Sequence, residues 1–142
     1  MTNERTLYGM PNVGCMLGTA YQTLVSRLAE ALAEAGLKIT VSEYLILRAL
    51  YTQDGMQQCE IAAMVGKDKG GVSRCVSAMV KKGLVSTECV SHKCLKVYLS
   101  PKGRGIEPKV MEVAKTRHEA LSSMLTSEEK TVFARVLKKI IQ

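Results

Sequence analysis

The chain has 142 residues, of which 46% are hydrophobic, with one Phe and no Trp, so it is expected to form one domain around an aliphatic, Met-rich core. Five Cys, an odd number without CxxC spacing, argue against a disulfide scaffold and a paired zinc knuckle. No apolar stretch approaches transmembrane length and no signal peptide is evident, so we expect a cytoplasmic protein without membrane attachment.

The net charge of +7 is concentrated in one segment. Residues 67–109 hold ten Lys or Arg against three acids, whereas the rest of the chain has ten of each. Such a concentration of charge is typical of a nucleic-acid-binding surface. A basic membrane-binding surface would need exposed Trp, Phe or Leu beside its lysines, and the segment lacks that pattern.

A long helix is predicted over residues 13–35. Its apolar residues recur at near-heptad spacing, and Gly36 follows as a C-terminal stop. The helix is longer than a small domain needs for its own core, so we expect it to pair with another chain. Residues 1–12, which Gly9 and Pro11 interrupt, are predicted to form a tail.

Two shorter helices are predicted next. The first begins at Ser42-Glu43 and ends at Asp54-Gly55, and the second covers residues 57–65. The buried face of the first is expected to hold Leu45, Ile46, Ala49 and Leu50.

Residues 67–82 predict a helix with two contrasting faces, begun by Asp68 as N-cap. The apolar stripe is Val72, Val76, Met79 and Val80, and the opposite stripe is Gly70, Ser73, Arg74, Ser77 and Lys81. The second stripe is small, hydroxylated and basic, and it has no carboxylate, so it suits close approach to an anionic surface. The alternative is an ordinary solvated basic face. Residues 57–82 together form a helix-turn-helix pattern.

A hairpin is predicted after Gly83. Its strands are residues 84–90 and 94–99, and Ser91-His92-Lys93 forms its tip. Ser100-Pro101 then begins a helix, with a kink or restart expected near Pro108. The pattern Thr126-x-x-Glu129 predicts a capping box for a last helix with an apolar face.

The predicted fold is mainly α with a small β-hairpin wing. A winged helix-turn-helix domain, residues 39–100, is combined with a helical dimerisation region formed by residues 1–38 and 101–142.

The order of elements and the residues resemble the MarR family of bacterial winged-helix regulators. The matching segments are ITVSEYLILRAL (39–50), CEIAAMVGKDKGGVSRCVSAMVKKGLV (59–85) and VYLSPKGRG (97–105). The resemblance implies a homodimer that places one recognition helix per subunit in a major groove of double-stranded DNA. It also implies control of transcription by a small-molecule effector or an oxidant.

The wing departs from the family pattern. The family usually carries Asp-x-Arg or Asp-Arg-Arg there, with the Asp bracing an Arg that reaches the minor groove. Those positions fall on Ser91, His92 and Lys93, so the bracing carboxylate is absent. His92 would add charge only below about pH 6.5, and the alternative is a solvated turn residue.

Arg74 is the best candidate for a base contact, with Ser73 and Ser77 contacting a base edge or phosphate. Gly70 and Gly71 would let the backbone approach the duplex, or they are simply tolerated near a helix start. The phosphate candidates are Lys67, Lys69, Lys81 and Lys93, each with a solvated lysine as the alternative.

The cysteines leave alternatives open. Cys15 lies where peroxide-sensing members of the family carry a reactive Cys, although the supporting tyrosines look missing, and the alternative is a buried structural Cys. Cys89 and Cys94 could face each other across the wing, or bind a metal with His92, but three ligands on one turn make a poor site. Cys59 and Cys75 are expected to pack in the helix-turn-helix.

Met residues with Tyr21 and Tyr44 could line an effector pocket, or they belong to the core.

The predicted function is a sequence-specific transcriptional regulator, a repressor, that leaves a palindromic operator on a signal. The alternative is a winged-helix module that binds an acidic protein. No catalytic triad, phosphate loop or metal motif is present, so we expect neither an enzyme nor a cofactor.

Overall fold

The computed structural model describes residues 6–91 and 94–142, and it confirms the predicted mainly helical fold with a small antiparallel sheet. Helices and strands follow one another as β1 (Thr6–Leu7), β2 (Met10–Pro11), α1 (Val13–Glu34), α2 (Val41–Thr52), β3 (Met56–Gln57), α3 (Gln58–Val65), α4 (Lys69–Lys81), β4 (Val85–Ser91), β5 (Cys94–Leu99), α5 (Pro101–Gly105), α6 (Glu107–Ser122) and α7 (Ser127–Ile141).

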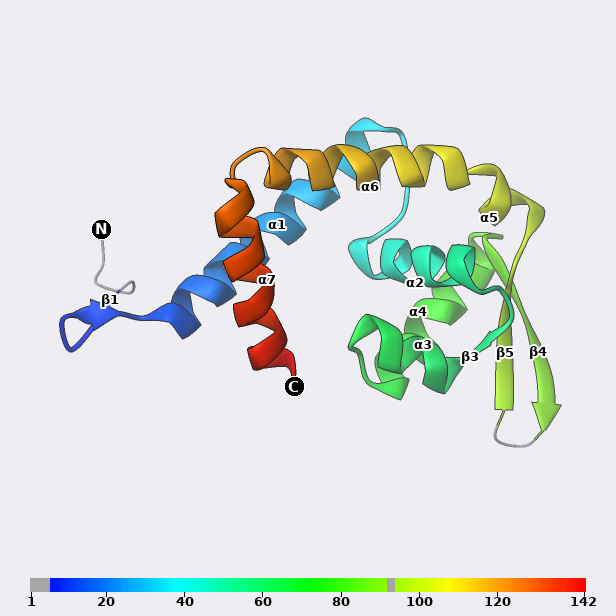
Figure 1. The fold of residues 1–142 in the computed structure, drawn as a ribbon. Coiled ribbons are helices and arrows are strands. Elements are labelled where there is room, and N and C mark those ends of the chain that lie inside the picture. Colours follow the sequence, from blue (N-terminus) through cyan, green and yellow to red (C-terminus); the bar gives the residue numbers. More distant parts are fainter. Residues whose placement is uncertain (1–5, 92–93) are drawn as a thin grey trace.

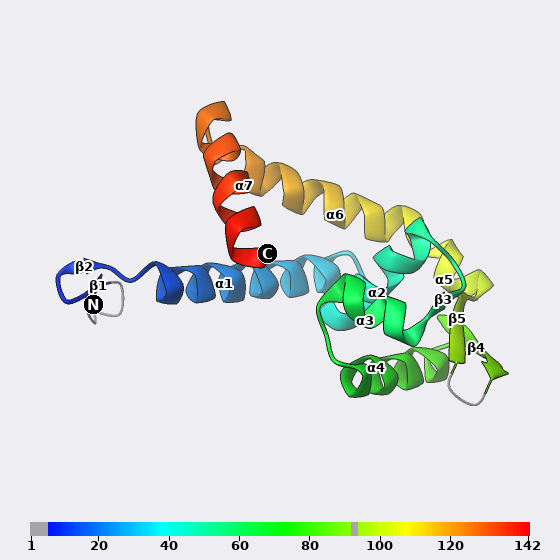
Figure 2. The ribbon, with the colours of Figure 1, turned by 60° about the horizontal axis from the view of Figure 1, so that its bottom comes forward.

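The molecule has a winged-helix lobe and an arm that the long helices α1, α6 and α7 form (Figure 1). Helices α2, α3 and α4 and the sheet, in the order β3-β5-β4, form the lobe. Helix α6 contacts α1, and α7 turns back from the end of α6 toward α1 (Figures 1 and 2). The arm therefore begins and ends the chain, and the lobe lies between in sequence.

The hydrophobic core lies in the lobe and reaches into the arm. Ile46 and Leu50 of α2, Ile61 of α3 and Val97 of β5 are almost fully buried. Leu32 of α1 and Val110 of α6 are also fully buried in this cluster. Burial of each of these aliphatic side chains stabilises the fold by roughly 1.5–3 kcal/mol, and together they join the lobe to the arm.

Several predicted helix starts are confirmed by their caps. The Asp68 carboxylate accepts a hydrogen bond from the Gly71 amide at 2.6 Å, and Ser100 Oγ accepts one from the Gly103 amide at 3.0 Å. Thr126 and Glu129 form a reciprocal capping box. The start of α2 lies one residue before the predicted Ser42, because Thr40 and Glu43 form a capping box and the helix begins at Val41.

Other local features differ from the prediction. Residues 6–11 form a two-stranded ribbon in the predicted tail, and the two-residue strand β3 was missed. The restart predicted near Pro108 is confirmed, however: α6 begins after Ile106, so Pro108 lies in its first turn, where the missing amide N–H costs no hydrogen bond.

The predicted apolar stripe of α4 is only partly buried. Val72, Val76 and Met79 are buried, whereas Val80 is 43% exposed. Eight residues after Val72, Val80 is rotated by about 80° around the helix and lies at the edge of the stripe.

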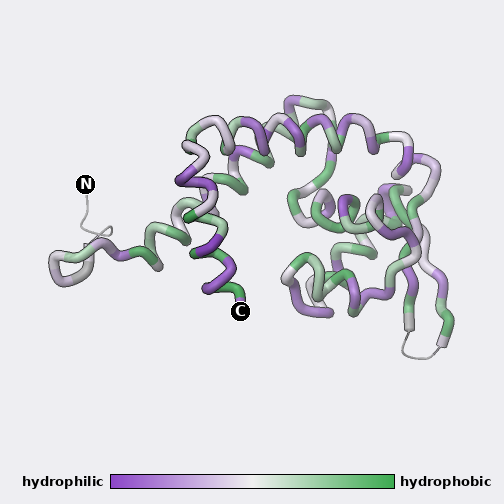
Figure 3. The backbone as a smooth tube through the Cα atoms, viewed as in Figure 1, coloured by the Kyte–Doolittle hydropathy of each residue, from purple (hydrophilic) through white to green (hydrophobic). Residues whose placement is uncertain are grey.

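Both α1 and α7 present exposed apolar side chains. On α7 these are Val132, Phe133, Val136, Ile140 and Ile141. On α1 they are Val13, Met16, Leu17, Tyr21 and Leu24. Figure 3 shows hydrophobic segments, in green, along both helices. Within residues 6–91 and 94–142, no helix combines the length and hydropathy needed to span a bilayer.

Candidate nucleic-acid interface

Helix α4 places its polar stripe on the outside of the lobe. Ser73, Arg74, Ser77 and Lys81 are exposed, while the opposite side of the helix packs on the core. Figure 2 shows α4 at the outer edge of the lobe, with the wing beside its end. The lysines at the start, Lys67 and Lys69, are also exposed. The predicted stripe is therefore a continuous exposed surface of hydroxyl and basic groups.

The two glycines at the start of α4 have packing reasons of their own. A Cβ on Gly71 would lie 2.8 Å from Asp68 Oδ1, the oxygen that caps the helix. A Cβ on Gly70 would lie 3.3 Å from a guanidinium nitrogen of Arg74, so the Arg74 side chain lies back over the first turn. The glycines thus give room to the cap and to the arginine, and their approach to a duplex stays a prediction.

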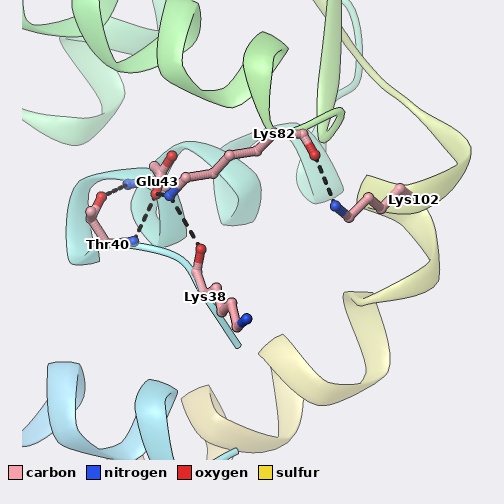
Figure 4. Close-up of polar contacts among 5 residues, drawn as sticks. All are labelled: Lys38, Thr40, Glu43, Lys82 and Lys102. Atoms are coloured by element: carbon pink, nitrogen blue, oxygen red, sulfur yellow. Dashed lines mark hydrogen bonds and ion pairs between the residues drawn. The ribbon is translucent and has the colours of Figure 1, made fainter. Parts of the chain in front are cut away.

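The end of α4 is fixed by a half-buried ion pair that the sequence analysis missed (Figure 4). Lys82 Nζ lies 2.6 Å from Glu43 Oε1 and donates to the Lys38 carbonyl at 3.2 Å. Glu43 is 1% exposed, and Oε1 also accepts the Thr40 amide, while Oε2 has no hydrogen-bond partner within the described residues. Although Lys82 follows Lys81 in the basic run, its ammonium group is bound within the fold, to Glu43 and to the Lys38 carbonyl.

A second lysine holds the same helix end. Lys102 Nζ of α5 donates to the Lys82 carbonyl at 2.9 Å (Figure 4), and Ser100 Oγ donates to the Gly83 carbonyl at 2.5 Å. These two bonds join the end of the candidate recognition helix to the segment that follows the wing.

The base of the wing is fixed by Asp54, which the sequence analysis used only as a turn residue. Asp54 Oδ1 accepts the Leu99 amide at 2.8 Å, and Oδ2 accepts from the Arg104 guanidinium. Carboxylate and guanidinium brace the last residue of β5 against α5. The wing-tip candidates His92 and Lys93 lie outside the described residues, so their DNA contacts stay predictions.

Cys89 and Cys94 are not directly opposed in the wing, so one of the alternatives that their positions left open is excluded. Cys89 pairs with Leu95 and Cys94 with Ser91, because the register shifts between Cys89 and Ser91. The exposed Cys89 thiol donates instead to the Ser91 carbonyl at 3.2 Å. The metal site that would also have used His92 involves residues beyond those described, and the described part of the chain contains no cluster of three metal-ligating side chains.

The remaining cysteines divide between interior and surface. Cys75 of α4 is half-buried, and burial, together with the Glu43 carboxylate, raises the pKa of its thiol. Cys59 is exposed, so the expectation that it packs in the helix-turn-helix is wrong. Cys15 is partly buried in the first turn of α1, where its amide donates to Asn12.

A cavity of about 510 Å³ lies between α1 and α2. Tyr21 lines this cavity, whereas Tyr44 is only 4% exposed and belongs to the core, with the Arg48 guanidinium over its ring. The lining residues are Tyr21, Gln22, Val25, Ser26, Val41, Ser42, Leu45 and Lys67.

Residues 39–88 match the sequence model of the MarR family, a span that contains α2, α3, α4 and the start of the wing. No curated protein sequence matches the chain.

Solved structures of MarR proteins have the same fold. A mutant Escherichia coli MarR in complex with operator DNA has a TM-score of 0.81 and 22% identity, over 92% of this chain and 94% of that one. A MarR protein from Peptoclostridium difficile has a TM-score of 0.82 and 21% identity, over 95% of this chain and 87% of that one. BpsR of Bordetella bronchiseptica, whose DNA binding is regulated by 6-hydroxynicotinic acid, has a TM-score of 0.80 and 20% identity, over 91% and 93%.

Several of the matched structures are described as transcriptional regulators, among them those from Methanosarcina mazei and Silicibacter pomeroyi. Residues 39–88 are therefore similar in sequence to the MarR family, and nearly the whole chain has the fold of the solved MarR structures.

Proposed function

We propose that the chain is a MarR-family regulator, a cytoplasmic, sequence-specific repressor that binds a palindromic operator as a homodimer. The observation that carries the proposal is the exposed stripe of α4, which offers hydroxyl and basic groups without a carboxylate. An anionic duplex is the partner that such a surface fits. The E. coli relative of the same fold was crystallised with operator DNA.

Within this proposal the contacts divide by chemistry. Arg74 reads a base edge, because a guanidinium can bond guanine O6 and N7 together. Ser73 and Ser77 contact a base edge or phosphate. Lys67, Lys69 and Lys81 contact phosphates, and Lys93 and His92 extend this role to the wing tip.

Dimerisation is proposed through residues 1–38 and 101–142. The exposed apolar side chains of α1 and α7 form two faces that a monomer leaves in water, including Phe133, Val136 and Leu24. Exposed apolar surface of this extent is typical of a protein interface. The lobe, residues 39–100, is left free to meet DNA.

The signal that releases the operator is proposed to be a small molecule, with oxidation of Cys15 as the alternative route. The cavity beside Tyr21 joins α1 to α2 and is large enough for a drug-sized ligand. Two structural relatives respond to or bind small molecules, namely 6-hydroxynicotinic acid and p-coumaroyl-CoA. Release by peroxide that a thiol reductant reverses, and that Cys15→Ser abolishes, would favour the oxidant.

The direct test is selection of bound sites from random duplexes by the purified protein. The proposal expects a palindrome whose half-sites are about one helical turn apart. Enrichment of single, unpaired sites would contradict the dimer. Absence of duplex binding even at low salt would contradict the function and favour the alternative, a module that binds an acidic protein.

A further inference from the structure

We infer that Asp54 and Arg104 are positioning residues that set the direction of the wing, and that they act on DNA affinity through the wing rather than by contact with the duplex. That the pair fixes the wing is argued from its contacts, whereas the consequence for DNA rests on the proposed function. Asp54 lies in the turn between α2 and β3, and Arg104 lies in α5, which follows the wing.

The outer strand of the wing is exposed along most of its length. In β4 only Val85 is buried, and residues 86–91 are all exposed. The strand order β3-β5-β4 leaves β4 at the edge of the sheet, with β5 as its neighbour on one side. Figure 1 shows β4 on the outside of the lobe, with β5 between it and the helices. The direction of the wing is therefore set at its base, where β5 ends.

A small rotation at the base becomes a large displacement at the tip. A strand rises by about 3.3 Å per residue, so residues 86–91 extend over about 20 Å. A rotation of about 10° at the base then moves the far end by about 3.5 Å. This displacement is larger than the span of distances over which a hydrogen bond forms. Contacts near the tip therefore depend on a base that is held in one direction.

The base is held by the turn between α2 and β3. Asp54 Oδ1 accepts the Leu99 amide at 2.8 Å, which adds one bond beyond the two residues of β3 that pair with β5. Tyr98 lies directly over Gly55, where a Cβ would be 2.8 Å from the tyrosine ring. Asp54 Oδ2 accepts from the Arg104 guanidinium. One carboxylate thus joins the end of β5 to α5.

This ion pair controls orientation more than the stability of the fold. The side chain of Arg104 is 58% exposed and that of Asp54 is 27% exposed. Exposed ion pairs contribute little to the free energy of unfolding, because water screens the charges. Without the guanidinium, however, the carboxylate can rotate, and the Leu99 amide loses an acceptor that is fixed in place.

Positioning and simple electrostatics predict opposite results for Asp54. Near a duplex, loss of a carboxylate strengthens binding and loss of a guanidinium weakens it, because phosphates attract cations and repel anions. If the pair positions the wing, loss of either partner weakens binding by the same factor. Loss of both partners then weakens binding no further, because the first substitution has already broken the contact.

The direction of the wing is measured without DNA. One nitroxide label is placed on the exposed Cys89 of the wing and another on Arg48→Cys of α2, in a chain whose other four cysteines are replaced by serine. Double electron–electron resonance gives the distribution of distances between the labels, and dilution with unlabelled chains leaves only pairs within one chain.

The distribution should be broader in Asp54→Asn and in Arg104→Gln than in the labelled parent. Lys109→Gln, which removes an exposed cation from α6, is the control and should leave the distribution unchanged. A distribution in Asp54→Asn or Arg104→Gln that is no broader than that of the control overturns the inference.

The effect on DNA is tested with a duplex from the site selection. Asp54→Asn, Arg104→Gln and the double variant should each bind about fivefold more weakly than wild type. Arg48→Gln, at an exposed arginine outside the wing and the polar stripe of α4, should bind as wild type does. Unchanged binding, tighter binding by Asp54→Asn, or additive losses in the double variant would overturn the effect on DNA.

The variants separate this inference from the proposed function. Asp54→Asn keeps an oxygen that can accept the Leu99 amide, so we expect it to fold, and circular dichroism of each variant verifies the fold. Because the distances are measured without DNA, a protein that shows the expected broadening but binds no duplex contradicts the proposed function and leaves the positioning of the wing standing. Wild-type duplex binding that neither substitution changes contradicts the inference and leaves the proposed function standing.

Discussion

Lys81 and Lys82 are neighbours in the sequence, yet the structure gives them opposite roles. Lys81 is exposed on the polar stripe, whereas Lys82 compensates the buried Glu43 carboxylate. Lys82→Gln should lower the free energy of unfolding by about 1–3 kcal/mol, because it leaves that carboxylate without its cation. The loss is smaller than for a fully buried ion pair, because the lysine side chain is partly exposed to water. Urea unfolding measures the change.

The matched control is Lys81→Gln, which should change the free energy of unfolding by less than about 0.5 kcal/mol and still weaken duplex binding. Equal stability losses in the two variants would show that the ion pair does not hold the end of α4.

Tyr51 joins α2 to α5 through one hydrogen bond. Its hydroxyl donates to the Gly103 carbonyl at 2.7 Å, and burial, with a smaller effect of Glu107, raises the pKa of Tyr51 to about 12. Tyr51→Phe should therefore lower the free energy of unfolding by about 1 kcal/mol at neutral pH.

The pKa of Tyr51 in the folded chain lies above its ordinary value of 10.0, so the protonated hydroxyl stabilises the fold fully below pH 10. The difference between wild type and Tyr51→Phe should then shrink as pH rises from about 10 to about 12. The free energy of unfolding, measured for both proteins across this pH range, checks this prediction, and Tyr8→Phe, at an exposed tyrosine, is the control. A difference that is constant with pH would contradict the raised pKa.

Among the elements, α5 depends on a close approach to the turn between α4 and β4. A Cβ on Gly103 would lie 2.2 Å from the Leu84 carbonyl oxygen, which is backbone and cannot move aside alone. Gly103→Ala should lower the free energy of unfolding by about 3 kcal/mol, measured by urea unfolding.

Gly105→Ala is the matched control in the same helix, because nothing lies within 4 Å of its Cβ position. It should be neutral or raise stability by up to about 1 kcal/mol. A Gly103→Ala variant as stable as Gly105→Ala would contradict the packing of α5 against Leu84.

The elements also show what the sequence could predict. The caps at Asp68, Ser100 and Thr126 were predictable because each side chain accepts a hydrogen bond from the backbone amide only three residues further along the chain. The exposed stripe of α4 follows from helical period in the same way. The pair Glu43–Lys82 was not predictable, because its partners are 39 residues apart and only the fold brings them together. Likewise, Asp54 and Arg104 are 50 residues apart.

Burial of single residues was less predictable than helix position. Val80 lies on the edge of its stripe, and Tyr44 is covered by elements distant in the sequence, so periodicity alone could not decide their exposure. The strand β3 has two residues, too few for an alternating pattern, and it exists because β5 pairs with it.

For the whole molecule, the exposed apolar faces of α1 and α7 carry the prediction of a dimer. Phe133→Glu places a charge in the proposed interface and should shift the mass measured by sedimentation equilibrium from dimer toward monomer. Val90→Glu, a similar change on the exposed wing, should leave the dimer intact. A dimer that withstands Phe133→Glu would contradict the assignment of α7 to the interface.

The central claim, that the exposed face of α4 reads DNA through Arg74, is tested most directly by the duplex affinity of Arg74→Ala. Its control is Arg48→Ala, an exposed arginine on α2 that lies outside the polar stripe of α4 and outside the proposed dimerisation region. For the selected palindrome, Arg74→Ala should lose about 1–3 kcal/mol of binding free energy and lose its preference for one base pair per half-site, whereas Arg48→Ala should bind as wild type does. Unchanged affinity and unchanged base preference in Arg74→Ala would contradict the claim.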